Sequence, residues 1–222
     1  RLGIPYNSVV DILQQIKSNE HLKCEGIYSH YATADEGELS YAEYQLDQFN
    51  QVLQAAKELD LRIKHIHFSN SGTVLNMPQT SFNLVRVGML LYGSFPSDEV
   101  PMDMPIKPVM EFKGPVVALR EVSAGTKVSY GGAWEAPQDT IIGVIQTGFA
   151  DGFPRSWYMD GYVGLRGKYY PIAGRVCMDQ FMVDFGEANV SVGDEVLIFG
   201  QNDAETIRIE DIAQAIDSTS YV

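Results

Sequence analysis

Apolar residues in the first hundred positions recur at helical spacing in two segments. The first helix is predicted to follow a capping box at 8–11, and the second to run from a similar box at 40–43 to about Leu59. Each has one apolar stripe, which indicates a helix that covers a core with one face. The stripes are Val9, Ile12, Leu13 and Ile16 in the first helix, and Ala42, Phe49, Val52, Leu53 and Ala56 in the second.

Three short apolar runs predict strands at 24–31, 62–72 and 83–93, with a helix starting near Thr73 after the second run. Repeated strand–helix units favour a parallel sheet. A closed βα barrel needs about 250 residues, and this region supplies less than half of that. We therefore expect residues 1–104 to form the C-terminal half of a TIM (β/α)8 barrel, with its first half upstream.

The pattern changes at about Pro105 to short runs rich in Val, Ile and Tyr, separated by Gly, Pro or Asp. Such spacing is typical of antiparallel strands in small sandwiches and barrels. One short helix is predicted near 209–216, and the proline-rich segment 96–108 predicts a linker. The expected fold is thus α/β plus all-β, with residues 105–222 as a C-terminal domain of antiparallel strands.

Composition limits the classes of function. With 222 residues, 45% hydrophobic and 20% charged, the chain is typical of a globular protein with one or two cored domains. Its net charge of −13 argues against nucleic acid or an anionic membrane surface as a partner. No apolar run approaches the ~18 residues of a membrane span, and the spacing of Cys24 and Cys177 suits a reducing cytoplasm better than a disulfide scaffold.

One charge interrupts the apolar run 83–93. Arg86 stays protonated in a protein and costs several kcal/mol to bury without a partner, so other groups must accept its hydrogen bonds. Residues 69–73 lie where a strand gives way to a helix, which suits either a phosphate site or a simple N-cap. Gly88 and Met89 add amide donors at a second strand end. Together these features suggest a phosphorylated ligand that contains a ring.

Other polar residues leave more than one interpretation. His30 ends a strand at a place where a barrel carries its site, although backbone groups alone can satisfy a histidine there. His65 and His67 share a strand face, but no third ligand follows at a recognisable spacing, so no metal site is expected and both are interpreted as structural. Tyr130 is positioned by a turn, or serves packing alone. Cys177 has no base nearby in the sequence and is not expected to be a nucleophile.

Six strings occur in the order and approximate spacing seen in alanine racemases, the pyridoxal-phosphate enzymes that interconvert L- and D-alanine. The chain resembles that family over nearly all of its 222 residues. The resemblance implies a βα barrel joined to a β domain, and a cytoplasmic homodimer whose sites each combine one subunit's barrel with the partner's β domain. The strings are SHYATADE (29–36), FSNSG (68–72), LVRVGMLLYG (84–93), VSYGGAW (128–134), TGFADG (147–152) and GRVCMDQ (174–180).

The resemblance also implies how the cofactor, pyridoxal 5'-phosphate, is held. Arg86 is similar to the arginine that donates to the pyridine nitrogen, which then stays unprotonated and makes the ring a weaker electron sink. Phosphate binding is assigned to Ser71 with the backbone of Gly88 and Met89. The residue that bridges Arg86 and the catalytic tyrosine is matched by His30, with Asn70 in support.

For the amino-acid substrate, the resemblance makes Tyr130 the base that takes the α-proton of L-alanine, while a lysine serves the D-isomer. A phenol has a pKa of about 10, so neighbouring positive charge, expected from His30 and Arg86, must lower it. The backbone at Met178 matches the contact for the substrate carboxylate, and Arg1 matches the arginine that reaches the cofactor's phenolic oxygen. The entry corridor is matched by Asp35, Phe149, Arg155 and Asp179.

The chain also departs from the family pattern. None of its lysines stands in the context of the family's Schiff-base lysine, which we expect upstream of Arg1, and a phosphate-binding tyrosine is expected beyond residue 222. Phe149 occupies a position where tyrosine is usual. Two alternatives to an alanine racemase therefore stay open, namely a racemase that acts on serine and a relative that binds the cofactor without catalysis.

Overall fold

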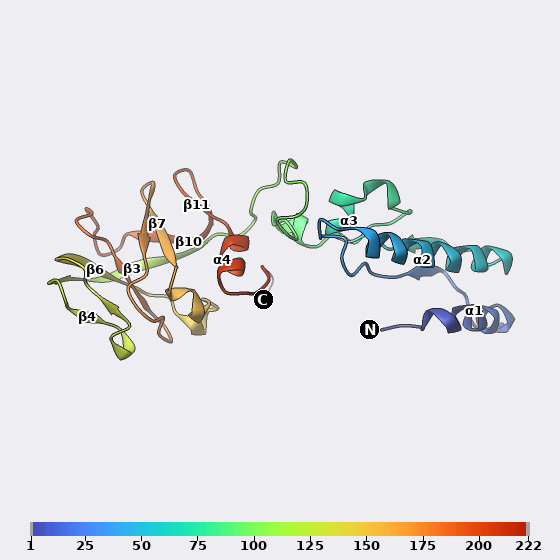
Figure 1. Cartoon of the computed structure of the whole chain (residues 1–222), viewed down its shortest axis with the longest axis horizontal. Helices are drawn as coiled ribbons and strands as arrows, with labels where there is room; N and C mark the ends of the chain where they lie inside the picture. The colour runs from blue at the N-terminus through green and yellow to red at the C-terminus, as the bar shows by residue number, and fades with distance from the viewer. Residues whose placement is uncertain (1, 221–222) are drawn as a thin grey trace. The chain divides into compact units, whose positions relative to one another are not determined.

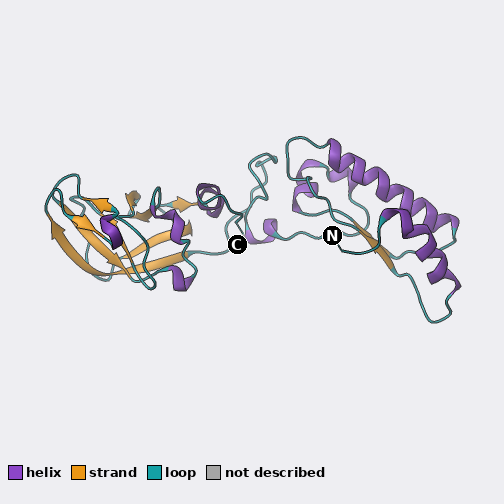
Figure 2. Cartoon of the chain, turned by 60° about the horizontal axis from the view of Figure 1, so that its bottom comes forward, coloured by secondary structure: helices purple, strands orange, loops and turns teal. Residues whose placement is uncertain are grey.

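The computed structural model describes residues 2–220, and the chain divides into two compact units. Unit 1 is Arg1–Ile106 and unit 2 is Lys107–Val222. Helices dominate the first unit and strands the second (Figures 1 and 2). Among the described residues, no helix is both long and apolar enough to cross a membrane.

Unit 1 carries two short parallel strands packed on helices. Strand β1 (Gly26–Tyr28) pairs with β2 (His65–His67), so that Tyr28 lies opposite His67. Ile27 and Ile66, one residue earlier in each strand, pack on the core of this unit. The helical elements are η1 (Tyr6–Ser8), α1 (Val9–Ser18), α2 (Ser40–Glu58), α3 (Ser71–Asn76), η2 (Pro78–Thr80) and η3 (Met89–Tyr92). Because strand side chains alternate between faces, Tyr28 and His67 point away from that core.

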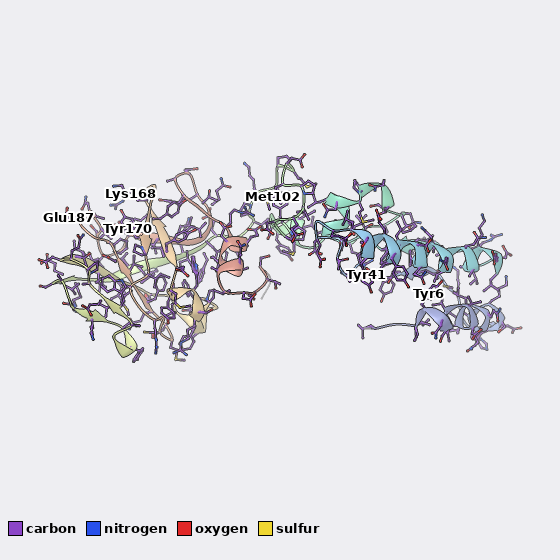
Figure 3. All side chains as sticks on the ribbon, viewed as in Figure 1. Tyr6, Tyr41, Met102, Lys168, Tyr170 and Glu187 are labelled. Carbon is purple, nitrogen blue, oxygen red and sulfur yellow. The ribbon has the colours of Figure 1, made fainter. Side chains whose placement is uncertain are left out.

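The predicted apolar stripe of α2 is largely confirmed, since Ala42, Phe49 and Ala56 are buried. Ala42 and Phe49 share the core of unit 1 with Tyr31 and Phe68, whose ring centroids are 3.7 Å apart in a stacked arrangement. On the solvent side, the Tyr6 hydroxyl donates to Gln51 and so connects η1 to α2. Figure 3 labels one residue of each of these elements, Tyr6 and Tyr41.

The two predicted capping boxes are wrong, although α1 does begin directly after Ser8. Neither helix has a side-chain cap. Ser40 is the first residue of α2 rather than its cap, because the Glu38 carboxylate accepts from both its amide and its hydroxyl. A capping box is instead present at α3, where Asn70 caps the helix and pairs with Thr73.

The strand predicted at 83–93 is also wrong, since this segment contains no strand and ends in η3. It still runs beside β2. The Arg86 amide donates to the Ser69 carbonyl, while the Asn83 side chain accepts from Ile66 N and donates to Lys64 O. A side-chain amide thus replaces the backbone bonds of a regular ladder, which explains why no strand forms there.

Unit 2 is an antiparallel sheet that curls on itself. Its strand order is β8-β7-β10-β3-β6-β9. The additional strand β11 pairs with the C-terminal end of β10, at Gly200 and Gln201. A bridge between Ile172, just after β8, and Val183 of β9 links the two ends of that order. The strands are β3 (Phe112–Val122), β6 (Thr140–Ile145), β7 (Tyr162–Leu165), β8 (Lys168–Pro171), β9 (Phe181–Asp184), β10 (Glu195–Gln201) and β11 (Thr206–Ile207).

Short elements at the rim complete unit 2. A hairpin of β4 (Lys127–Val128) and β5 (Trp134–Glu135) encloses the turn η4 (Tyr130–Gly132). Two further turns, η5 (Phe149–Asp151) and η6 (Arg155–Tyr158), follow β6, and α4 (Ile209–Ala215) confirms the helix predicted near 209–216. The apolar core inside the sheet includes Phe153, Trp157, Phe181 and Phe185.

Candidate functional site

Arg86 lies at the centre of a hydrogen-bond network in unit 1. Its Nη1 is 2.6 Å from Nδ1 of His67 and 3.2 Å from the His67 carbonyl oxygen. Its Nη2 donates to the Ser29 carbonyl at 2.8 Å and lies 3.0 Å from Nδ1 of His30. The partners predicted from the single charge in an apolar run are therefore backbone carbonyls and two histidines.

The chemistry of Arg86 fixes the proton positions on both histidines. A guanidinium only donates, so Nδ1 of His30 and Nδ1 of His67 must both be acceptors, which leaves the ring proton of each neutral imidazole on Nε2. Burial lowers the pKa of His67, and the charges of Arg86 and His65 lower it further. His67 is thus held in the neutral form that Arg86 requires.

This pairing has a consequence for stability as a function of pH. The folded-state pKa of His67 lies below its ordinary 6.5, so the unfolded chain takes up a proton more readily than the folded chain. The contribution of His67 to stability should be complete above pH 6.5 and decrease as the pH falls below it. Urea unfolding on both sides of this pH should show a dependence that His67→Gln removes and that His21→Gln, at an exposed histidine, leaves unchanged. If the free energy of unfolding depended on pH equally in wild type and in His67→Gln, the contribution assigned to His67 would be contradicted.

No carboxylate pairs with Arg86 among the residues 2–220 that the structure describes. All the hydrogen bonds recorded for its guanidinium use Nη1 and Nη2, so within the same residues its Nε–H has no partner. A cation with one unused donor and only neutral neighbours suits a ligand atom that accepts a hydrogen bond, such as an unprotonated heteroaromatic nitrogen.

A second group of donors lies at the start of α3 and at Gly88 and Met89, which follow Arg86 closely in the sequence. Ser71 is the first residue of α3, directly after the N-cap Asn70, and its hydroxyl oxygen accepts from the Gly88 amide at 3.1 Å. Met89 follows Gly88 at the start of η3. Amide and hydroxyl donors that converge in this way suit a phosphate. Asn70 has its side-chain oxygen engaged as the cap of α3, which is a structural use of that residue.

Asp35 lies in a loop that is held on several sides. The glycine of FSNSG allows the close approach, because a Cβ on Gly72 would lie 2.8 Å from both the backbone nitrogen and the Cβ of Asp35. The Ser97 hydroxyl donates to the Asp35 carbonyl, and Asn76 donates to Ala34 O at 3.1 Å. The loop that carries the predicted corridor residue is thus fixed against the start of α3.

In unit 2, the strings VSYGGAW and GRVCMDQ touch each other. Ser129, just before Tyr130, has a φ of 69°, which is a strained value for a residue with a side chain. Its hydroxyl donates to Arg175 O at 2.8 Å, and a Cβ on Gly174 would lie 2.5 Å from the Ser129 Cβ. These contacts hold the turn on which Tyr130 stands, with its side chain 70% exposed.

The string TGFADG packs on the other side of GRVCMDQ. The amide of Phe149 donates to Cys177 O at 3.0 Å, and the amide of Ala150 donates to Met178 O at 2.8 Å. A Cβ on Gly148 would lie 2.3 Å from that same Met178 oxygen. Segment 174–179, which includes Met178, therefore contacts both other strings and fixes the backbone next to Tyr130 and at Phe149.

Gly148→Ala tests this packing. The added methyl group cannot fit against the backbone of Met178 and Asp179, so we expect the free energy of unfolding to fall by about 3 kcal/mol. Urea unfolding followed by circular dichroism would measure it, with Gln146→Ala at an exposed neighbouring position as the control. An unchanged unfolding midpoint in Gly148→Ala would show that the two strings are not in contact.

An open depression of about 470 Å³ in unit 2 is lined by Arg155, Ser156, Tyr158 and Arg175. Arg155 also lies over the ring of Phe149, with Cζ 5.5 Å from the ring centre. Neither arginine has a salt-bridge partner within the described residues. Two unneutralised guanidinium groups would attract an anion such as an amino-acid carboxylate.

Burial raises the pKa of the Cys177 thiol, and the charge of Asp179 raises it further, against a smaller opposite effect of Arg155. The thiol therefore stays protonated at neutral pH, which makes it a poor nucleophile. Across the described residues, no group of three or more His, Cys, Asp or Glu side chains gathers at metal-binding distance. Arg1 lies outside the described residues.

Each of the two units matches a different model of a known protein family. A family model described as the alanine racemase N-terminal domain matches residues 1–96, and one described as the C-terminal domain matches residues 109–222. The chain belongs to the alanine racemase family. A curated relative named alanine racemase, from Halothermothrix orenii, is 37% identical over the whole chain and 59% of its own length. Another, from Desulforamulus reducens, is 40% identical over 90% of the chain and 54% of its own length.

Solved structures agree with this family. The alanine racemase from D-cycloserine-producing Streptomyces lavendulae matches the whole chain and 59% of its own chain, with a TM-score of 0.93 and 33% identity. The expected fold, half of a βα barrel followed by an antiparallel β domain, is thereby confirmed. The chain spans less than two thirds of the length of these alanine racemases.

Three residues without a predicted site role have one in the structure, two beside Arg86 in unit 1 and one in the depression of unit 2. We interpreted His67 as structural, whereas it contacts Arg86 directly. Tyr28, which stacks on His67, was not singled out. Arg175 stood inside a recognised string without a role, and it lines the depression beside Arg155. In each strand, the residue before Tyr28 or His67, namely Ile27 or Ile66, is apolar and faces the core. The alternation of strand side chains therefore predicts that Tyr28 and His67 both point to the opposite face, and this signal could have found them.

Proposed function

We propose that this chain is part of an enzyme that interconverts L- and D-alanine with pyridoxal 5'-phosphate as cofactor. The observation that carries this proposal is Arg86, a cation bound only by carbonyl oxygens and neutral histidines, with its Nε–H unused among the described residues. An aspartate or glutamate at this place would favour a protonated pyridine. A guanidinium instead favours an unprotonated one.

The donor set of unit 1 fits the two ends of this cofactor. Ser71 and the amides of Gly88 and Met89 would bind the phosphate, and Arg86 the ring nitrogen. When bound, the cofactor withdraws electrons from the amino acid and so makes its α-proton acidic. With the ring nitrogen unprotonated, this withdrawal is weaker, which favours return of the proton over side reactions.

Tyr130 would take the α-proton on the L-face, because its hydroxyl is exposed on a turn held by Ser129 and Gly174. His30, whose Nδ1 lies 3.0 Å from Nη2 of Arg86, would connect Arg86 to this phenol. Tyr130 belongs to unit 2, whereas His30 and Arg86 belong to unit 1. In a homodimer with shared sites, these residues would come from two subunits.

The substrate would be a small amino acid whose carboxylate is bound by the backbone at Met178. Asp35, Phe149, Arg155 and Asp179 would line the way in, and Arg175 would lie beside them. Arg1 would reach the cofactor's phenolic oxygen. The product D-alanine would serve cell-wall peptidoglycan, and the enzyme would work in the cytoplasm.

The test uses the full-length protein. Added pyridoxal phosphate should produce a visible absorbance band that persists after dialysis, and the loaded protein should convert either pure enantiomer of alanine into a racemic mixture, followed by circular dichroism. L-Serine is assayed in parallel, since small pockets discriminate weakly against an added hydroxyl. Cofactor retention without loss of optical activity would identify a non-catalytic relative. Failure to retain the cofactor would contradict the proposal as a whole.

A further inference from the structure

Arg86 is held by ring contacts as well as by hydrogen bonds. The Tyr28 ring stacks on His67 with centroids 5.0 Å apart and planes 7° apart. The guanidinium carbon of Arg86 lies 5.7 Å from the centre of the same Tyr28 ring. One phenol ring therefore contacts both partners of the 2.6 Å hydrogen bond between Arg86 and His67.

Tyr28 has no other evident use in unit 1. The residue is 69% exposed and lies outside the core cluster of unit 1, and within residues 2–220 its hydroxyl makes no hydrogen bond. A large ring at such a position usually contributes through its contacts with neighbouring rings and cations. The register of β1 and β2, which sets Tyr28 directly opposite His67, makes this stack possible.

The orientation of the His67 ring matters because its acceptor must face Arg86. Nδ1 accepts in the plane of the imidazole, and a hydrogen bond weakens steeply as its angle departs from linear. A stacked neighbour opposes tilting of that plane. Tilting of His67 would leave Nη1 with only its longer, 3.2 Å bond to the His67 carbonyl oxygen, which would loosen the guanidinium and let the direction of its Nε–H vary.

We propose that Tyr28 is a positioning residue, whose ring holds His67 in the orientation that accepts from Arg86 and thereby fixes the direction of the Arg86 Nε–H. The ligand that this donor meets rests on the proposed function. The positioning of Arg86 does not, because all three side chains lie within unit 1.

The first test measures cofactor affinity in the full-length protein by absorbance or fluorescence titration. Tyr28→Leu removes the ring and should raise the dissociation constant of pyridoxal phosphate about tenfold, the combined worth of one ring stack and one cation–π contact. Tyr28→Phe keeps the ring and should stay within about twofold of wild type, since a hydroxyl without a partner contributes little. Tyr44→Leu, at an exposed tyrosine of α2 whose ring contacts Tyr41, is the matched control.

The second test reads the His67 ring directly, and its decisive wild-type measurement needs no variant. Nitrogen NMR shifts of His67 in the cofactor-free protein should show a neutral ring protonated on Nε2 near neutral pH in wild type and Tyr28→Phe. Tyr28→Leu should show a mixture of the two tautomers. A wild-type ring protonated on Nδ1 would overturn the proposal, because that nitrogen could not accept from Arg86.

The outcomes separate the two proposals. If wild type fails to bind pyridoxal phosphate, the proposed function fails and the NMR result still decides the positioning of Arg86. If wild type binds and Tyr28→Leu matches it in both affinity and His67 tautomer, Tyr28 has no positioning role while the function stands.

Discussion

Arg86→Met should lower the proposed racemase activity of the full-length protein at least about 100-fold, because it would remove the donor proposed for the cofactor ring together with the charge proposed to support Tyr130. It should also lower the free energy of unfolding by about 3 kcal/mol, since the acceptors at Ser29, His30 and His67 lose their donor. Activity assays and urea unfolding measure the two effects separately.

Arg62→Met is the matched control, because it makes the same chemical change at an exposed arginine of unit 1. Near-normal activity and stability are expected there. If Arg86→Met also kept its activity, the guanidinium would not face the cofactor. If activity fell while stability stayed at the wild-type value, the hydrogen-bond network around Arg86 would contribute little to the fold.

Tyr130→Phe should lower turnover of L-alanine by about 10²–10⁴-fold, the usual contribution of a positioned acid–base group. Cofactor affinity should stay close to wild type, because the phosphate and ring donors proposed here all lie in unit 1 whereas Tyr130 lies in unit 2. The turn itself should persist, since Ser129 and Gly174 rather than the phenol hydroxyl hold it.

Tyr169→Phe removes a hydroxyl of another exposed tyrosine in unit 2, one that donates to Thr206 O, and should leave turnover unchanged. Equal loss of cofactor affinity and turnover in Tyr130→Phe would assign Tyr130 to cofactor binding. Solvent-isotope exchange at the α-carbon gives a further check, since the variant should lose exchange from L-alanine more than from D-alanine.

The sequence was informative where the pattern depends on burial. The stripe of α2, the change to antiparallel strands and the short helix α4 were all predictable because apolar residues follow the period of the element they form. The helix starts were less predictable. Ser8 and Ser40 have the right spacing for capping boxes, but a nearby carboxylate, Glu38, took the donors of Ser40.

The sequence predicted the charged residue at the centre of the unit 1 site, Arg86, but not the side chains that hold it in place. Arg86 stood out because a cation in an apolar run needs partners. Those partners lie just after β1, 56 and 57 residues earlier in the chain, and in β2, 19 residues earlier. Sequence alone could not show that His67 and Tyr28 stack, since that depends on the register of two strands. Likewise, the contact of Gly148 with Met178 depends on how two distant turns meet.

The bonds that join residues 149 and 150 to residues 177 and 178 run between main-chain atoms. Any residue type except proline supplies the amide that Phe149 contributes. A tyrosine could therefore replace phenylalanine at position 149, or the reverse, without loss of these main-chain hydrogen bonds. A change of side chain at position 149 would therefore alter the proposed entry corridor without altering the main-chain bonds beneath it.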